Sequence, residues 1–116
     1  MALLSWLTRN WADTDEPGST VLPLELPWPP TEALQRVETA VAALPRWAVV
    51  AADRTAGTLT ATRTTRLWRF VDDIRLRLEA TERGSRLHAR SQSRVGKGDF
   101  GQNRRNLVAL FNALAV

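Results

Sequence analysis

The chain has 116 residues, a length that favours a single domain with one modest core. It contains no cysteine and one histidine, His88, which excludes disulfides, thiolate zinc sites, a cysteine nucleophile and paired histidine ligands. Residues 1–62 carry four basic and seven acidic side chains, whereas residues 63–116 carry twelve basic and five acidic ones. Eleven of those twelve are arginines, which suit carboxylate or phosphate recognition, so the second half predicts an anionic partner.

The N-terminal residues predict a segment outside the main domain. Residues 2–12 predict a short amphipathic helix, whose apolar residues at helical spacing are Leu3, Leu4, Leu7 and Trp11. Residues 13–19 predict a linker, so we expect an N-terminal segment and linker over 1–20 and one α+β domain over 21–116. The helix either packs back on the domain or docks on a partner or a membrane surface, and both alternatives stay open. The apolar run is shorter than a signal peptide requires and no segment reaches transmembrane length, so we expect a cytoplasmic protein.

A proline-rich strap and a helix come next. Residues 21–30, VLPLELPWPP, cannot form a helix because prolines recur throughout. Their alternation predicts an extended strap over the core, with one apolar side made of Leu22, Leu24, Leu26 and Trp28. An amphipathic helix is predicted from Thr31, its N-cap, to Pro45, which ends it. Its buried face is expected to hold Leu34, Val37, Val41 and Leu44.

Four strands follow, predicted over residues 47–53, 58–67, 68–81 and 86–95. Alternation in the third strand turns Trp68, Phe70 and Asp72 toward the core, and in the fourth it turns Ser91, Ser93 and Val95 inward. Asp99 and Gln102 then form a capping-box-like pair that opens a second helix. That helix is expected to bury Leu107, Leu110, Phe111 and Leu114.

These elements predict an α+β fold, a two-layer sandwich of order α-β-β-β-β-α plus the N-terminal extension. Short hairpin connections favour a four-stranded antiparallel meander sheet. Each helix has one apolar side, so both are expected on one sheet face, with the other face open to solvent.

The longest motif, RSQSRVGKGDFGQNRRN, occupies residues 90–106. With FVDD at 70–73, RSQSR at 90–94, Gly96 and DFGQN at 99–103, the chain resembles the domain-of-unknown-function 1499 family. The order of elements over residues 21–115 is also similar to that family. The resemblance implies a small bacterial α+β protein without an established function, and it brings no catalytic residue with it.

The residues of the motif support two interpretations. In the structural one, glycines allow a sharp turn from strand to helix, and a buried Asp72 requires polar partners, with Arg63 a further candidate. The expected structural polar network consists of Asp72, Ser91, Ser93, Asp99 and Asn103. In the functional one, arginines beside the helix start bind an anion. The anion-binding candidates are Arg90, Arg94, Lys97, Arg104 and Arg105.

The open sheet face is also basic, which makes nucleic acid a conceivable partner. Single-strand binders add exposed aromatic stacking platforms, and alternation turns the nearby aromatic residues inward, so a solvated face is favoured. His88 is interpreted as a surface residue of this face rather than a base or a metal ligand. Asp72 and Asp73 cannot act as a pair because adjacent strand residues point to opposite faces.

The favoured function is therefore a non-enzymatic binding or structural module that engages an anionic partner through arginines near the strand-to-helix motif. That partner is expected to be an anionic ligand or a protein. The alternative is an enzyme acting on a small anionic substrate, with Asp72 or Asp99 as the acid or base. No metal and no cofactor are expected.

Overall fold

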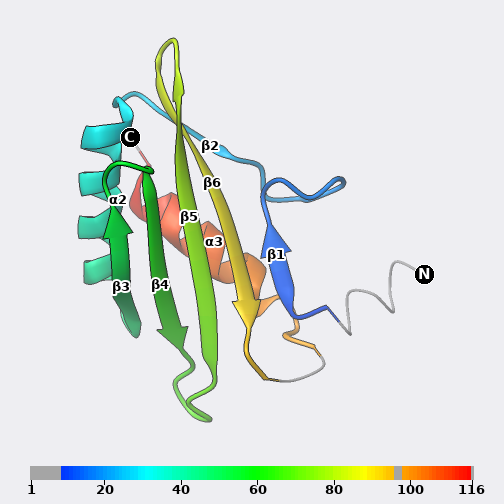
Figure 1. Cartoon of the computed structure of the whole chain (residues 1–116). Coiled ribbons are helices and arrows are strands. Elements are labelled where there is room, and N and C mark those ends of the chain that lie inside the picture. The colour runs from blue at the N-terminus through cyan, green and yellow to red at the C-terminus, as the bar shows by residue number, and fades with distance from the viewer. Residues whose placement is uncertain (1–8, 96–97, 116) are drawn as a thin grey trace.

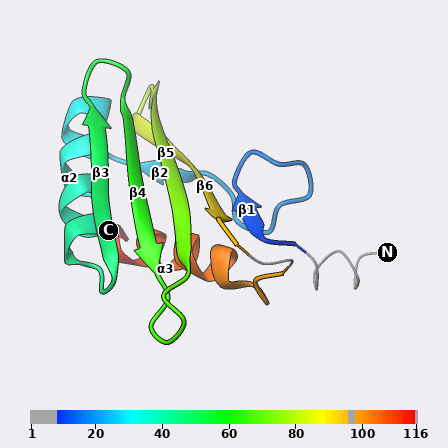
Figure 2. The same ribbon diagram turned by 60° about the horizontal axis from the view of Figure 1, so that its bottom comes forward.

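The computed structural model describes residues 9–95 and 98–115 of the chain. Within them the elements are β1 (Trp11–Asp13), β2 (Leu24–Leu26), α2 (Pro30–Ala43), β3 (Trp47–Asp53), β4 (Thr58–Thr64), β5 (Val71–Thr81), β6 (Gly84–Ser93) and α3 (Gln102–Ala113). Both helices lie on the same face of one antiparallel sheet (Figures 1 and 2), so the predicted α+β class is confirmed. Neither α2 nor α3 is long and apolar enough to span a membrane.

The sheet has six strands, so the expected four-stranded sheet is wrong. Strands β3 to β6 form the predicted meander, and β6 then pairs along its other edge with β1 and with β2. Ala12 lies opposite Ser91 in one pairing, and Glu25 lies opposite Arg86 in the other. Both added strands have only three residues. Alternation cannot be recognised over so short a length, and nearby turn residues and prolines obscured it further.

The helix predicted over residues 2–12 is wrong in the part that the structure describes. Residues 11–13 are extended and hydrogen-bonded to β6, not helical, and the rest of the expected 2–12 helix falls largely on residues 1–8, outside the described ranges. The main chain of Asn10 also accepts a hydrogen bond from the Ser93 backbone at 2.9 Å. The free backbone groups along the edge of β6 account for this choice, because an unpaired strand edge favours the addition of another strand.

Residues 65–70 form a loop between β4 and β5, although strands were expected to run through them. The Thr65 backbone N–H donates to the Phe70 carbonyl, and the Phe70 N–H donates to Thr65 Oγ1, both at 2.8 Å. Arg69 has a left-handed backbone with φ 57°, which lets the chain reverse. Trp68 and Phe70 are consequently exposed, and their expected core-facing orientation is wrong. Val95 is exposed for a related reason, since β6 ends at Ser93.

The core lies between the inner face of the sheet and the two helices. Alternate residues of β4, β5 and β6 supply one side, and α2 and α3 supply the other. The helix α2 buries Leu34, Val37 and Val41 as expected, but it begins at Pro30, before the predicted cap Thr31. Proline suits the first helical turn because the missing N–H has no partner there anyway.

The proline-rich strap is an edge segment that only partly covers the core. Leu26 is buried and Leu24 packs against the core, whereas Leu22 faces solvent, so the expected one-sided apolar row is incomplete. The strap passes so close to the β5–β6 hairpin that a Cβ at Gly84 would clash with the Leu26 carbonyl oxygen. Glycine at position 84 is therefore a condition for docking the strap.

Candidate functional site

A buried polar network occupies the junction of β5, β6 and α3. Asp72 is 2% exposed, and its two carboxylate oxygens accept hydrogen bonds from Ser93 Oγ at 2.9 Å and Asn106 Nδ2 at 2.8 Å. Asn106 Nδ2 also lies 3.1 Å from Ser91 Oγ. Within the described part of the chain, Asp72 forms no ion pair, so neutral donors alone contact this carboxylate.

The start of α3 is tied to the same network through Asp99 and Asn103. Asp99 accepts hydrogen bonds from the backbone N–H groups of Gly101 at 2.8 Å and Asn103 at 3.0 Å. Asn103 Nδ2 lies 2.6 Å from Asp99 Oδ2 and 2.8 Å from Ser93 Oγ. Gln102 does not reach back to complete a capping box; its amide donates instead to Asn106 Oδ1 at 2.8 Å.

The structure thus brings together the five residues expected in a polar network, Asp72, Ser91, Ser93, Asp99 and Asn103. It adds Asn106, which the sequence reasoning missed. Asn106 is three residues after Asn103 on one helix, and both side chains are buried, so their spacing was the available signal. Arg63, a suggested partner of Asp72, makes no hydrogen bond to it among the described contacts.

The proposed anion-binding arginines lie at separate places. Arg90 and Arg94 line a hollow of about 270 Å³ on the outer sheet face, the face away from the helices. Arg104 lines a different hollow of about 340 Å³ with Asp99, and its Nε donates to Thr20 Oγ1 at 2.9 Å. Arg105 donates to the Phe100 carbonyl at 2.8 Å. Lys97 lies outside the described residues.

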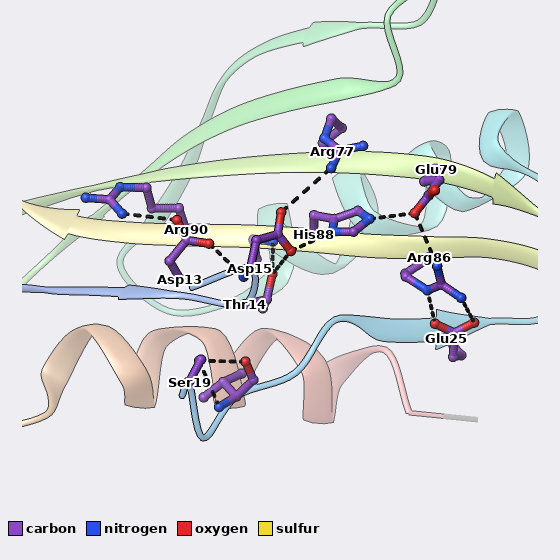
Figure 3. A network of polar contacts seen from close by, with 12 residues as sticks. Asp13, Thr14, Asp15, Ser19, Glu25, Arg77, Glu79, Arg86, His88 and Arg90 are labelled. Carbon is purple, nitrogen blue, oxygen red and sulfur yellow. Dashed lines mark hydrogen bonds and ion pairs between the residues drawn. The ribbon is translucent and has the colours of Figure 1, made fainter. Parts of the chain in front are cut away.

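Acidic side chains from the first part of the chain cover much of the outer face of β6 (Figure 3). Asp13 forms an ion pair with Arg90 at 3.1 Å. Asp15 lies 3.7 Å from Arg77 and 2.7 Å from His88 Nδ1. These contacts fasten the segment after β1 to the sheet and neutralise positive charge there.

His88 bridges two carboxylates in this network. Its Nδ1 faces Asp15 and its Nε2 lies 2.8 Å from Glu79 Oε1, and Figure 3 shows the ring between them. A ring nitrogen that carries a proton can donate it to the carboxylate that it faces, because an ionised carboxylate only accepts hydrogen bonds. Burial raises the pKa of Asp15, but the hydrogen bond and charge of His88 outweigh it, and the pKa lies below its usual value. His88 hydrogen bonds likewise lower the pKa of Glu79.

Two further arginines are paired with carboxylates on the same face. Arg86 pairs with Glu25 of β2 and, at 3.4 Å, with Glu79. Arg94 makes two hydrogen bonds of 2.8 Å to Asp73, which lower the pKa of that carboxyl against the opposing effect of burial. The hydrogen bonds to Asp73 also raise the pKa of Arg94. Arginines on the outer face are therefore largely bound to carboxylates.

A different surface keeps its positive charge: the end of the sheet where the β4–β5 loop and the strand-to-helix connection lie. We call it the basic end and define it by the arginines Arg46, Arg63, Arg66, Arg69 and Arg105. The Thr64 N–H donates to the Arg46 carbonyl at 2.9 Å, which joins the end of β4 to the connection between α2 and β3. The Arg94 N–H donates to the Val71 carbonyl at 3.0 Å, which joins the start of β5 to the connection between β6 and α3. None of these five arginines pairs with a carboxylate in the described parts of the chain.

The charges of the basic end affect one another. Burial, followed by the positive charge of Arg46, lowers the pKa of Arg63, and Arg105 acts in the same direction. Asp72 opposes this shift. Arg66 and Arg69 are exposed on the β4–β5 loop, and this loop projects past the end of the sheet at the bottom of Figure 1. Within the described residues none of the five guanidinium groups forms an ion pair with a carboxylate, so net positive charge remains at this end.

The fold and the network define a small α+β protein in which helix α3 is held on an antiparallel sheet by buried polar side chains. The chain matches the family model described as "Protein of unknown function (DUF1499)" over residues 6–114. It belongs to this family, as the resemblance in residues 70–73 and 90–106 indicated. Comparisons with curated proteins and with solved structures gave no match.

Proposed function

We propose that the protein is a non-enzymatic binding module that engages an anionic partner through the basic end. The observation that carries this proposal is the distribution of ion pairs. Acidic residues of the first half neutralise arginines on the outer face, and none reaches the five arginines of the basic end within the described residues. The expected function is retained, but its location moves from Arg90 and Arg104 to the surface around Arg66, Arg69 and Arg105.

Backbone conformation at two of these arginines also supports the proposal. Arg46 has φ 65° and Arg69 has φ 57°, a left-handed region that disfavours residues with a Cβ by about 1–2 kcal/mol. Glycine would fit both turns at lower energetic cost. Arginine at such positions is more readily explained by a use for its side chain than by the turn itself.

The enzyme alternative finds less support. Asp72 is buried and both its oxygens accept hydrogen bonds. Asp99 borders a hollow, but its two oxygens bind backbone and side-chain donors at the start of α3. A general acid or base requires an oxygen within reach of substrate, and in this arrangement both carboxylates hold the fold together instead.

The test compares retention on immobilised heparin at low ionic strength. We expect the protein to bind and to elute as salt rises, because neutralised anionic sites release counterions. The double variant Arg66→Gln/Arg69→Gln should elute at clearly lower salt, with the slope of log affinity against log salt reduced by about 2.

The matched control is Arg75→Gln/Arg83→Gln, which removes the same charge from two other arginines that lack an ion pair among the described residues. Arg75 lies on the outer face and Arg83 in the β5–β6 hairpin at the opposite end of the sheet. The control should elute close to the unaltered protein. Equal shifts for both double variants would mean that only net charge matters, and the proposed site would be wrong.

A further inference from the structure

We infer that the anionic partner of the basic end is the surface of a lipid bilayer containing anionic lipids. This inference rests on the proposed function and adds a second property of the same surface, its apolar tip. The tip is defined by Leu67, Trp68, Phe70 and Val95. Three of the four are more than half exposed, with Leu67 at 78%, Trp68 at 72% and Val95 at 61%.

The geometry of the tip places its apolar and charged groups in the order that a membrane interface requires. Leu67 and Trp68 occupy the turn of the β4–β5 loop, and Arg66 and Arg69 flank them directly in the chain. The loop projects beyond the sheet in both views of the ribbon (Figures 1 and 2). The apolar pair can thus enter the acyl boundary while the guanidinium groups remain at the phosphates.

The side chains favour lipid over nucleic acid. A single-stranded nucleic acid binds in a groove with aromatic faces for successive bases, whereas this surface is a protruding loop. Leu67 and Val95 are aliphatic and offer no stacking face. Tryptophan suits the boundary between headgroups and acyl chains, where its ring is apolar and its N–H finds a polar partner.

Carboxylates near the tip already accept hydrogen bonds from other groups of the protein. Asp73 pairs with Arg94, and Asp72 and Asp99 accept hydrogen bonds in the buried network. Approach to a negatively charged surface therefore meets little repulsion from this end. A single arginine near such a surface contributes only modestly to binding, so several are needed for stable binding.

The experiment measures sedimentation of the protein with vesicles of phosphatidylcholine alone and with added phosphatidylglycerol. We expect binding only to the mixed vesicles, with quenching of tryptophan fluorescence by brominated acyl chains. The quenching should disappear in Trp68→Phe, which identifies the inserted ring among five tryptophans.

Two double variants separate lipid insertion from charge. Leu67→Ala/Trp68→Ala should weaken vesicle binding at least about tenfold, from the apolar surface it removes, and leave heparin retention unchanged. Leu22→Ala/Val50→Ala shortens two apolar residues elsewhere that are also more than half exposed, and it should leave vesicle binding and heparin retention unchanged.

Each other outcome has a defined meaning. Heparin retention without vesicle binding would overturn the lipid inference and leave the proposed function standing. Binding of a single-stranded oligonucleotide with Trp68 quenching, and no vesicle binding, would assign the surface to nucleic acid. Unchanged vesicle binding in Leu67→Ala/Trp68→Ala would also overturn the inference. A protein that binds neither heparin nor vesicles would contradict both proposals.

Discussion

Asp72 is a buried carboxylate that accepts its hydrogen bonds from neutral donors. A buried charge is costly unless hydrogen bonds replace its hydration, and here Ser93 and Asn106 each supply one. These two donors are themselves tied to Asn103 and Ser91, so the carboxylate joins β5 to both β6 and α3. The motif residues of the strand-to-helix junction thus have a structural use that needs no ligand.

We expect Asp72→Ala to reduce the free energy of unfolding by about 2–4 kcal/mol, because it leaves buried donors without an acceptor. The control is Asp73→Ala on the neighbouring residue, whose exposed pair with Arg94 should contribute less than about 1 kcal/mol. Chemical denaturation of both variants measures the difference. A free energy of unfolding of Asp72→Ala equal to that of the unaltered protein would refute the structural role of the network.

At the scale of single residues, the sequence predicts burial well where alternation persists. The inward orientation of Asp72, Ile74 and Ser91 follows from a strand period that continues through β5 and β6. Trp68 was misplaced because the period was extended into a loop, where a left-handed Arg69 turns the chain. Asn106 was missed because its three-residue spacing from Asn103 was not connected with a buried carboxylate on the sheet.

At the scale of the elements, both backbone and side-chain contacts attach β1 to the edge of the sheet. The segment around β1 reaches β6 through three backbone pairings, and Asp13 and Asp15 add ion pairs on the outer face. Thr14 contributes too, since its N–H donates to the Ala89 carbonyl at 2.9 Å. The attachment of β1 therefore depends on carboxylates more than the central meander does.

This dependence predicts that β1 loosens first in acid. The folded-state pKa of Asp15 is below its ordinary value, so its stabilising effect is complete above about pH 4 and is lost as pH falls further. Hydrogen exchange of the Thr14 amide should accelerate as the pH falls below about 4, relative to core amides such as Ile74 and after correction for intrinsic rates. The variant Asp15→Asn should show a weaker change. An identical pH profile in the two proteins would contradict the assignment.

Elements longer than about five residues could be predicted from the sequence, and shorter ones could not. The strand over 47–53 has the predicted limits, and the helices α2 and α3 lie where amphipathic spacing placed them. The three-residue strands β1 and β2 exist because β6 offers an edge, which is a tertiary property. The same edge explains why the sheet has six strands.

For the whole molecule, the two halves of the chain carry opposite excess charge and fold onto one another. Acidic residues before residue 63 pair with several arginines of the outer face. Five of the arginines without an ion pair among the described residues lie where the β4–β5 loop and the strand-to-helix connection come together. Composition alone is enough to propose an anionic partner. It does not indicate which surface to propose for that partner, because this depends on which arginines meet carboxylates after folding.

The location of anion binding can be mapped directly by titrating the labelled protein with a heparin oligosaccharide and following its backbone amide resonances. The proposed site predicts that the largest shifts fall on residues 64–70 and on Arg46, Val95 and Arg105. Amides of the outer face near Arg75 and His88 should change little. Largest shifts at the outer face or along α2, with residues 64–70 unaffected, would contradict the assignment of function to the basic end.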